Sequence, residues 1–181
     1  MIFVRDKGRM CNNILQYGHL YAWARANNRK TVSMRFAYKY QYFHICRTRW
    51  HNFFVYLFAK YAAQLKLIPT VTFDTPDEDL NEKENAMRRG CLVAEGWYAR
   101  WYDLFLQYKS EILSLFTFDS QIESKVTSLL ETSSKEGIIR LGVHIRRGDY
   151  ATWNDGRFLY DDKQMINIIR QFILLHSNKR V

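Results

Sequence analysis

The order of apolar and polar positions predicts alternating strands and helices in the first hundred residues. Ile2-Phe3-Val4 is a short apolar run typical of a buried strand. A loop over residues 6–13 follows, and apolar residues at spacings of three and four then predict a helix over 14–26. Further strands are predicted over 31–34 and 91–94. Strand, loop, helix and strand in this order form the opening of an α/β domain.

The segment between the second and third predicted strands is less regular. Residues 36–50 are rich in aromatic rings and fit neither a helix nor a strand clearly, whereas the apolar positions from 54 to 61 have helical spacing. Six acids and a proline between 74 and 84 predict a solvated loop.

The last third of the chain shows further helices and one strand. Helical faces are predicted over 102–116 and 122–130, and Asp119 is placed to cap the second of these helices. The polar run 132–137 is the best candidate for a boundary, which predicts domains at 1–136 and 137–181.

The sharpest alternation along the chain lies in residues 138–145 and predicts a strand. Ile139, Leu141, Val143 and Ile145 would point to one side of it, opposite Arg140, Gly142, His144 and Arg146. Asp161 and Asp162 begin the last predicted helix, where negative charge suits a helix N-terminus.

A compact group of charged residues follows that predicted strand, in the order His144-Ile145-Arg146-Arg147-Gly148-Asp149-Tyr150. Ligands bind beyond the carboxyl ends of strands in open α/β sheets, and the guanidinium of Arg matches phosphate oxygens. Gly148 permits a sharp turn that brings Asp149 back toward an Arg, a His or a ligand hydroxyl. The spacing fits a binding site and a basic strand end paired with Asp149 about equally well.

This segment resembles the signature of the GDP-fucose-dependent fucosyltransferases, and the longer run from Gly142 to Tyr150 is most similar to their bacterial α1,2 branch. A second segment, Gly8-Arg9-Met10-Cys11-Asn12-Asn13, resembles the first loop of that superfamily, although Cys11 stands where Gly is usual and Asn13 where Gln is usual. A third, Gly96-Trp97-Tyr98, resembles another segment of the α1,2 branch. An ordinary strand-to-helix connection with Asn12 or Asn13 as N-cap is the alternative for the first loop.

The resemblance implies an α/β fold of the GT-B type, with two Rossmann-like lobes of which the second is only partly present. It also implies an inverting, metal-independent transfer of fucose from GDP-fucose to a glycan hydroxyl, with no cofactor. Arg146 and His144 would be the catalytic residues, with Arg146 at the β-phosphate. Arg147 and Asp149 would bind the donor, and Gly8, Arg9, Asn12 and Asn13 would complete the substrate site. Glu95, at a predicted strand end, is a candidate general base, with a solvated loop acid as the ordinary alternative.

Charge and composition add one alternative. Residues 1–60 hold eleven Lys or Arg and one acid, a net charge of +10, whereas residues 61–181 hold 16 bases and 17 acids. Such a basic, aromatic-rich segment is also typical of a nucleic-acid-binding module, although no nucleic-acid motif supports that function. An inactive fragment of a fucosyltransferase is the other alternative.

The cysteines and the apolar runs indicate in which cellular compartment the protein is expected. Three cysteines without paired spacing predict reduced thiols. No signal peptide and no stretch of 18 apolar residues is present, so the sequence predicts a cytoplasmic protein without a transmembrane segment, with peripheral membrane association as an option.

Overall fold

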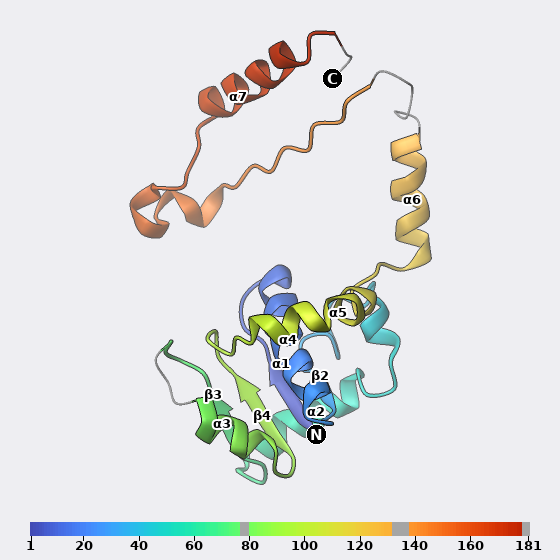
Figure 1. Ribbon diagram of the computed structural model, residues 1–181, viewed down its shortest axis with the longest axis vertical. Helices are drawn as coiled ribbons and strands as arrows, with labels where there is room; N and C mark the ends of the chain where they lie inside the picture. The colour runs from blue at the N-terminus through green and yellow to red at the C-terminus, as the bar shows by residue number, and fades with distance from the viewer. Residues whose placement is uncertain (77–79, 132–137, 179–181) are drawn as a thin grey trace. The chain divides into compact units, whose positions relative to one another are not determined.

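The computed structural model describes residues 1–76, 80–131 and 138–178 (Figure 1). The chain forms two compact units, residues 1–123 and 124–181, which are described separately below. The predicted domain boundary over 132–137 lies outside the described residues.

The first unit is built on a parallel sheet of four short strands, so the predicted α/β class is confirmed for this unit. The sheet order is β2-β1-β4-β3, with β1 at Ile2–Arg5, β2 at Thr31–Ser33, β3 at Thr70–Thr72 and β4 at Leu92–Glu95. The central strand β1 pairs with β2 from Ile2 to Val4 and with β4 from Ile2 to Arg5. All four strands therefore end at the same edge of the sheet.

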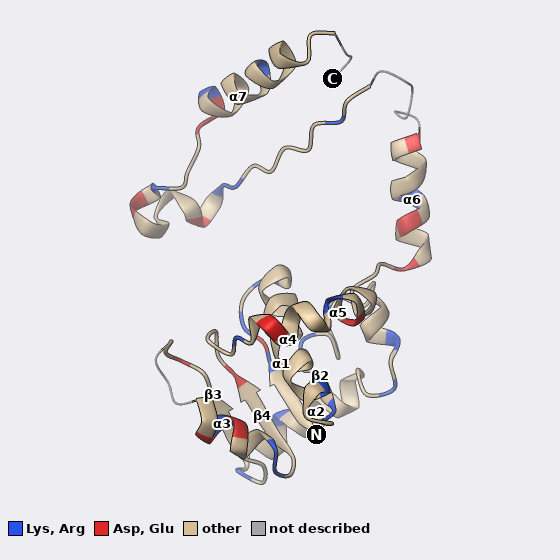
Figure 2. Ribbon diagram, in the orientation of Figure 1, with Lys and Arg blue, Asp and Glu red and all other residues tan. Residues whose placement is uncertain are grey.

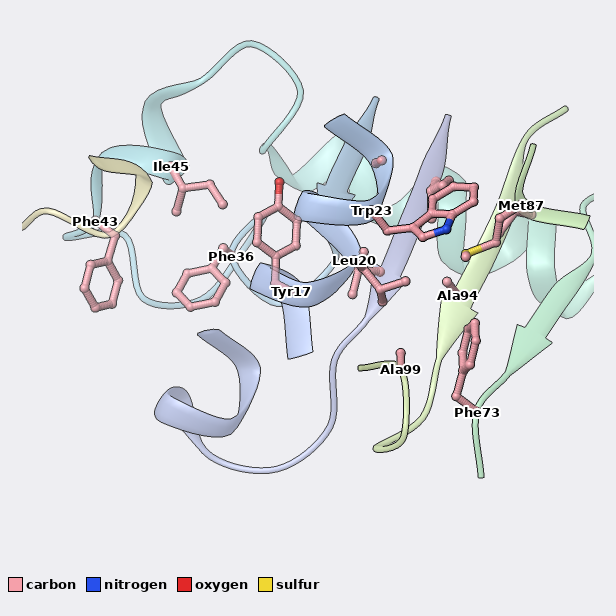
Figure 3. Packing of buried hydrophobic residues seen from close by; sticks show 14 residues of the cluster. Tyr17, Leu20, Trp23, Phe36, Phe43, Ile45, Phe73, Met87, Ala94 and Ala99 are labelled. Atoms are coloured by element: carbon pink, nitrogen blue, oxygen red, sulfur yellow. The ribbon is translucent and has the colours of Figure 1, made fainter. Parts of the chain in front are cut away.

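Helices cover both faces of this sheet. They are α1 at Met10–Ala26, α2 at Phe53–Gln64, α3 at Leu80–Met87, α4 at Tyr102–Gln107 and α5 at Lys109–Leu115, with a 3-10 helix at His44–Arg47. Because side chains alternate along a strand, Ile2 and Val4 pack with α1 in one apolar cluster, and Phe3 packs with Ala59 of α2 in another. Figure 3 shows the larger cluster, which gathers around Tyr17, Leu20 and Trp23 of α1 and is fully buried.

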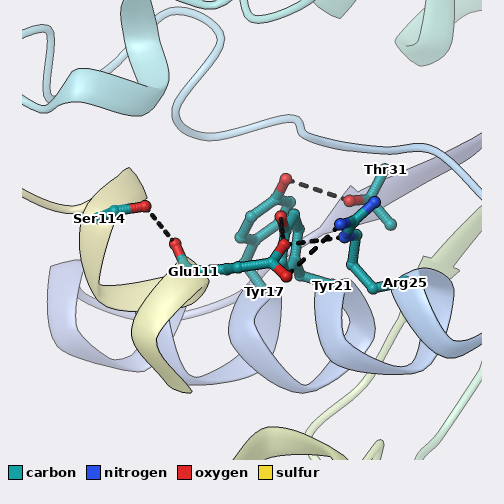
Figure 4. A network of polar contacts seen from close by, with 6 residues as sticks. All are labelled: Tyr17, Tyr21, Arg25, Thr31, Glu111 and Ser114. Atoms are coloured by element: carbon teal, nitrogen blue, oxygen red, sulfur yellow. Dashed lines mark hydrogen bonds and ion pairs between the residues drawn. The ribbon is translucent and has the colours of Figure 1, made fainter. Parts of the chain in front are cut away.

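Two local contacts hold the helices of the α1 face together. Gly18 of α1 lies against Phe105, and a Cβ at this glycine would come within 2.6 Å of the ring. Figure 4 shows the second contact, in which the Glu111 carboxylate of α5 accepts hydrogen bonds from Tyr21 Oη and Arg25 Nε, both at 2.9 Å. The α5 helix is thereby fixed along α1.

Most predicted elements of this unit are confirmed, with four corrections. The helix predicted over 102–116 is two helices, since α4 ends at Gln107 and α5 begins at Lys109. The helix α1 begins at Met10 rather than near residue 14, and neither Asn12 nor Asn13 caps it, because Arg9 is the N-cap residue. The prediction of a loop over 74–84 is wrong from Leu80 onward, where α3 begins and buries Met87 at its end. The strand β3 was not predicted, because its three residues give no alternation long enough to recognise.

The second unit contains helices, and the described residues give it no sheet. The helix α6, Ser120–Glu131, begins before the unit does, and Asp119 Oδ1 accepts a hydrogen bond from Gln121 N at 3.3 Å, as a cap does. The helix α7, Asp162–Leu175, begins at a capping box in which Asp161 and Gln164 exchange hydrogen bonds of 2.7 and 2.9 Å. The predicted helix start at Asp161 and Asp162 is therefore confirmed.

The strand predicted over 138–145 is not formed, which corrects the clearest expectation from the sequence. Residues 139–147 have no regular secondary structure. A strand is stabilised by hydrogen bonds to a neighbouring strand, and the described residues of this unit contain none to pair with. Val143 and Ile145 are consequently exposed.

Within the described ranges, no helix is long and apolar enough to cross a membrane.

Candidate functional site

The predicted catalytic residues His144 and Arg146 lie together in the second unit. Both line a cavity of about 240 Å³, whose wall includes Tyr150, Phe158 and Tyr160. The segment is folded by two 3-10 helices, Gly148–Ala151 and Trp153–Gly156, which bring the aromatic residues back toward His144. The predicted residues thus share one cavity, although they project from an irregular segment and not from a strand end.

Arg146 is the best-positioned residue of this cavity. Its guanidinium lies over the Tyr150 ring, 4.2 Å from the centroid, and Nη2 is 3.4 Å from Asp149 Oδ2. Its Nε is buried and has no hydrogen-bond partner among the described residues. A buried donor without an acceptor is costly, so this position favours an anionic or oxygen-rich ligand that supplies one.

The other predicted donor-binding residues occupy different positions. Gly148 has φ +73, a left-handed conformation that lets the chain turn, and Asp149 folds back to Arg146 as the sequence predicts. Arg147 pairs with Asp162 at the start of α7 instead of lining the cavity. Arg147 thus faces the start of α7, whereas Arg146 lines the cavity.

The predicted substrate residues of the first unit lie in the loop between β1 and α1. Gly8 has φ +91, which only glycine adopts easily. Asn13 is fully buried and donates from Nδ2 to Lys7 O at 3.0 Å, while its Oδ1 has no partner within the described chain. Arg9 and Asn12 stand at the exposed start of α1. The loop is thus built around a buried amide with one acceptor still available.

Gln16 was not singled out from the sequence, yet it fixes this loop. Its Oε1 accepts from Lys7 N at 3.1 Å, and its Nε2 donates to Lys7 O at 2.7 Å and to Asn12 O at 3.0 Å. These bonds give both the backbone N–H and the backbone carbonyl of Lys7 a partner. The spacing of nine residues from Lys7 to Gln16 gives no pattern by which the sequence could reveal them.

A second feature that the sequence did not indicate lies at the carboxyl edge of β1 and β2. Asp6 is buried and both of its carboxyl oxygens accept from Ser33 Oγ, at 3.1 and 3.0 Å. Arg35 Nε donates to the backbone oxygen of Asp6 at 3.2 Å. Loss of solvent on burial raises the pKa of Asp6 to about 7, against the smaller opposing effects of its hydrogen bonds and of Arg35. Its place directly after an apolar strand is the signal that could have identified it.

Two histidines and Glu95 of the first unit have structural partners. His19 Nδ1 accepts from Trp101 N at 3.1 Å, and His51 Nε2 accepts from Ser33 N at 2.9 Å. Burial lowers the pKa of each histidine to about 4, so both are neutral acceptors at neutral pH. Glu95 is 3.1 Å from Arg5 Nη1 and 3.9 Å from Lys7 Nζ, so this candidate general base is held by two cations.

In residues 1–76, 80–131 and 138–178, no three His, Cys, Asp or Glu side chains group closely enough to hold a metal ion. No known family model, curated protein or solved structure matches this chain. The function is therefore inferred from the geometry of the sites and from the motifs in the sequence.

Proposed function

We propose that the chain belongs to an inverting glycosyltransferase of the fucosyltransferase type, which transfers fucose from GDP-fucose to a glycan hydroxyl. The observation that carries the proposal is Arg146, whose buried and unpartnered Nε lines an aromatic cavity beside His144. GDP-fucose is proposed as the sugar nucleotide on the basis of the motifs at residues 8–13, 96–98 and 142–150. The GT-B arrangement of two Rossmann-like lobes is part of the same proposal.

The chemistry assigned to Arg146 follows from where charge develops. Transfer breaks the bond between C1 of fucose and the β-phosphate oxygen, and the bonding electrons leave with GDP. A guanidinium fixed at that oxygen stabilises the transition state more than the ground state, because the charge is fully developed only as the bond breaks. Arg146 is held for this task by the Tyr150 ring and by Asp149.

Inversion requires the acceptor hydroxyl to attack C1 from the side opposite GDP, while its proton passes to a base. In the proposal, His144 and Asp149 orient the donor, and the loop of Gly8, Arg9, Asn12 and Asn13 contributes to substrate binding. Arg146 supplies the charge stabilisation that a divalent metal gives in other sugar-nucleotide enzymes, which is why the proposal is metal-independent.

The state of the cysteines supports a location for this reaction. Cys11, Cys46 and Cys91 are all free thiols. Free thiols are typical of a reducing compartment, so we place the reaction in the cytoplasm.

The test compares the chain with two arginine variants. GDP-fucose binding is measured by calorimetry, and GDP release with and without glycan acceptors is measured by a coupled assay. Arg146→Ala should weaken GDP-fucose binding by about tenfold or more, since it removes a charged hydrogen-bond donor. Arg170→Ala changes an exposed arginine of α7 and should bind as the unaltered chain does.

Two results would contradict the proposal. One is GDP-fucose binding that Arg146→Ala and Arg170→Ala weaken equally, which would indicate only a general charge effect. The other is the absence of any GDP-fucose binding by a chain whose circular dichroism shows that it is folded.

A further inference from the structure

An exposed apolar stripe runs along α2 in the first unit. Phe54, Phe58, Tyr61 and Leu65, the residue after the helix, follow one another at spacings of four, three and four, so they lie on one side of it. Their exposed fractions are 81%, 60%, 52% and 68%. The inward side of the helix is also apolar, because Ala59 packs on the sheet and Ala62 is buried. An apolar stripe that stays exposed beside the buried face is typical of a binding surface.

The stretch of sequence that contains this stripe carries only positive charge. Between Lys7 and Phe73 the sequence contains eleven Lys or Arg and no Asp or Glu (Figure 2). Trp50, which is also exposed, lies just before α2 and has the guanidinium of Arg49 5.0 Å from its ring centroid. Exposed aromatic rings flanked by basic residues are the pattern of helices that lie in the plane of a membrane interface.

A cavity of about 270 Å³ opens beside the stripe and adds a specific place for an anion. Tyr56, Lys60 and Gln64 line it from the adjacent row of α2, and Arg5 and Arg35 line it from the carboxyl edge of the sheet. The acid that lines it is Asp6, which is buried and whose carboxyl oxygens accept hydrogen bonds from Ser33. No acidic side chain in the described part of the chain pairs with Lys60, so its ammonium group can serve a ligand.

We infer that α2 and this cavity form a docking surface for a membrane rich in anionic phospholipid. The apolar stripe enters the interface between headgroups and acyl chains, and the cavity receives a headgroup phosphate between Lys60 and Arg35. Apolar burial and attraction to anionic lipid act on the same face, which is the combination that stable peripheral binding requires.

Charge decides between this occupant and a second copy of the chain. An isologous contact through α2 would bring two basic faces together without an acid from either stretch of residues 7–73, and like charges at an interface oppose association. Anionic headgroups neutralise the same face.

The test is sedimentation of the 181-residue chain with large unilamellar vesicles. Vesicles of phosphatidylcholine alone are compared with vesicles that also contain phosphatidylglycerol, at low and high salt. The chain should sediment with the anionic vesicles and be released from them by salt, because salt screens the charge attraction. Binding to neutral vesicles should be much weaker.

Matched variants separate the two parts of the surface. Phe54→Ser with Phe58→Ser should reduce binding to anionic vesicles by about tenfold or more, whereas Leu106→Ser, on an equally exposed residue of α4, should leave it unchanged. Lys60→Gln should reduce binding by about fivefold, and Lys109→Gln on α5 should have little effect.

Three outcomes would overturn the inference. They are equal binding to neutral and anionic vesicles, a stable dimer of the chain that Phe54→Ser with Phe58→Ser dissociates, and salt-sensitive binding to single-stranded oligonucleotides without any binding to vesicles. Donor binding is measured separately, so loss of vesicle binding with GDP-fucose binding retained refutes only the membrane surface.

Discussion

Replacement of Asp6 by Asn tests the electrostatic account of the sheet edge. Asp6 lies directly after β1, is 1% exposed, and accepts hydrogen bonds of 3.1 and 3.0 Å from Ser33 Oγ. Asn has nearly the same shape and can still pair with Ser33, but it cannot ionise. The variant therefore removes the cost of burying a negative charge while it keeps the packing.

The expected magnitude follows from the pKa of this carboxyl. Burial raises the pKa of Asp6 from 3.8 to about 7, so between these pH values the folded chain holds a proton that the unfolded chain has lost. The contribution of Asp6 to stability is fully present below pH 3.8 and is lost as the pH rises toward 7. One proton corresponds to about 1.4 kcal/mol for each pH unit. Because the carboxyl is already half ionised at pH 7 in the folded chain, the change between pH 5 and pH 7 is roughly 2 kcal/mol.

Urea unfolding followed by circular dichroism at pH 5 and pH 7 gives the measurement. The free energy of unfolding of Asp6→Asn, minus that of the unaltered chain, should increase by roughly 2 kcal/mol between the two pH values. His19 and His51 titrate in the same range, but they are common to both proteins and cancel in the difference. Asp103→Asn, on an exposed residue of α4, should show no such increase.

Parallel pH profiles for Asp6→Asn and the unaltered chain would refute this reasoning. They would mean that Asp6 ionises in the folded chain as readily as in water, and that Ser33 and Arg35 compensate fully for its burial.

Two further predictions concern stability. Gly96→Ala should lower the free energy of unfolding in urea by about 3 kcal/mol or more, because Gly96 has φ +117 and a Cβ there would lie 2.3 Å from Phe73 O. Gly142→Ala, with nothing within 4 Å of its Cβ, should be close to neutral. Equal losses for the two variants would contradict the structure at the end of β4. Glu111→Gln should lower the free energy of unfolding by less than about 1 kcal/mol, because the ion pair with Arg25 is half exposed and Gln can still accept a hydrogen bond from Tyr21. A double-mutant cycle with Arg25→Met measures the coupling energy of the pair. A coupling energy above about 2 kcal/mol would show that the pair is stronger than its exposure implies.

The elements that the sequence predicted correctly are those whose pattern is set by local burial. The strand β1 is buried on both faces, so Ile2-Phe3-Val4 is apolar throughout and easy to recognise. The helix α3 shows the limit, since its central residues are polar and only Leu80 and Met87 at its ends pack on the core. Alternation over 138–145 fits a strand equally well, but pairing depends on a neighbour that the local pattern does not specify.

The candidate sites were predictable to the extent that their residues are close in sequence. Arg146 and Asp149 are three residues apart, and their pairing follows from the turn at Gly148. Asp6 and Ser33 are 27 residues apart and meet only because β1 and β2 are neighbouring parallel strands. The exposed stripe of α2 has the spacing of an ordinary core helix, so its exposure becomes evident only in the folded unit.

The pairing of β1 with β4 has a consequence for how the chain folds. The central strand of the sheet is synthesised first, yet one of its two neighbours ends at Glu95, 90 residues later. Closing a loop of this length lowers the entropy of the chain before any hydrogen bond between the strands forms, so contacts of such separation form slowly. During synthesis, β1 therefore has one unpaired edge until β4 has been made, and the first unit is most prone to aggregation in this interval.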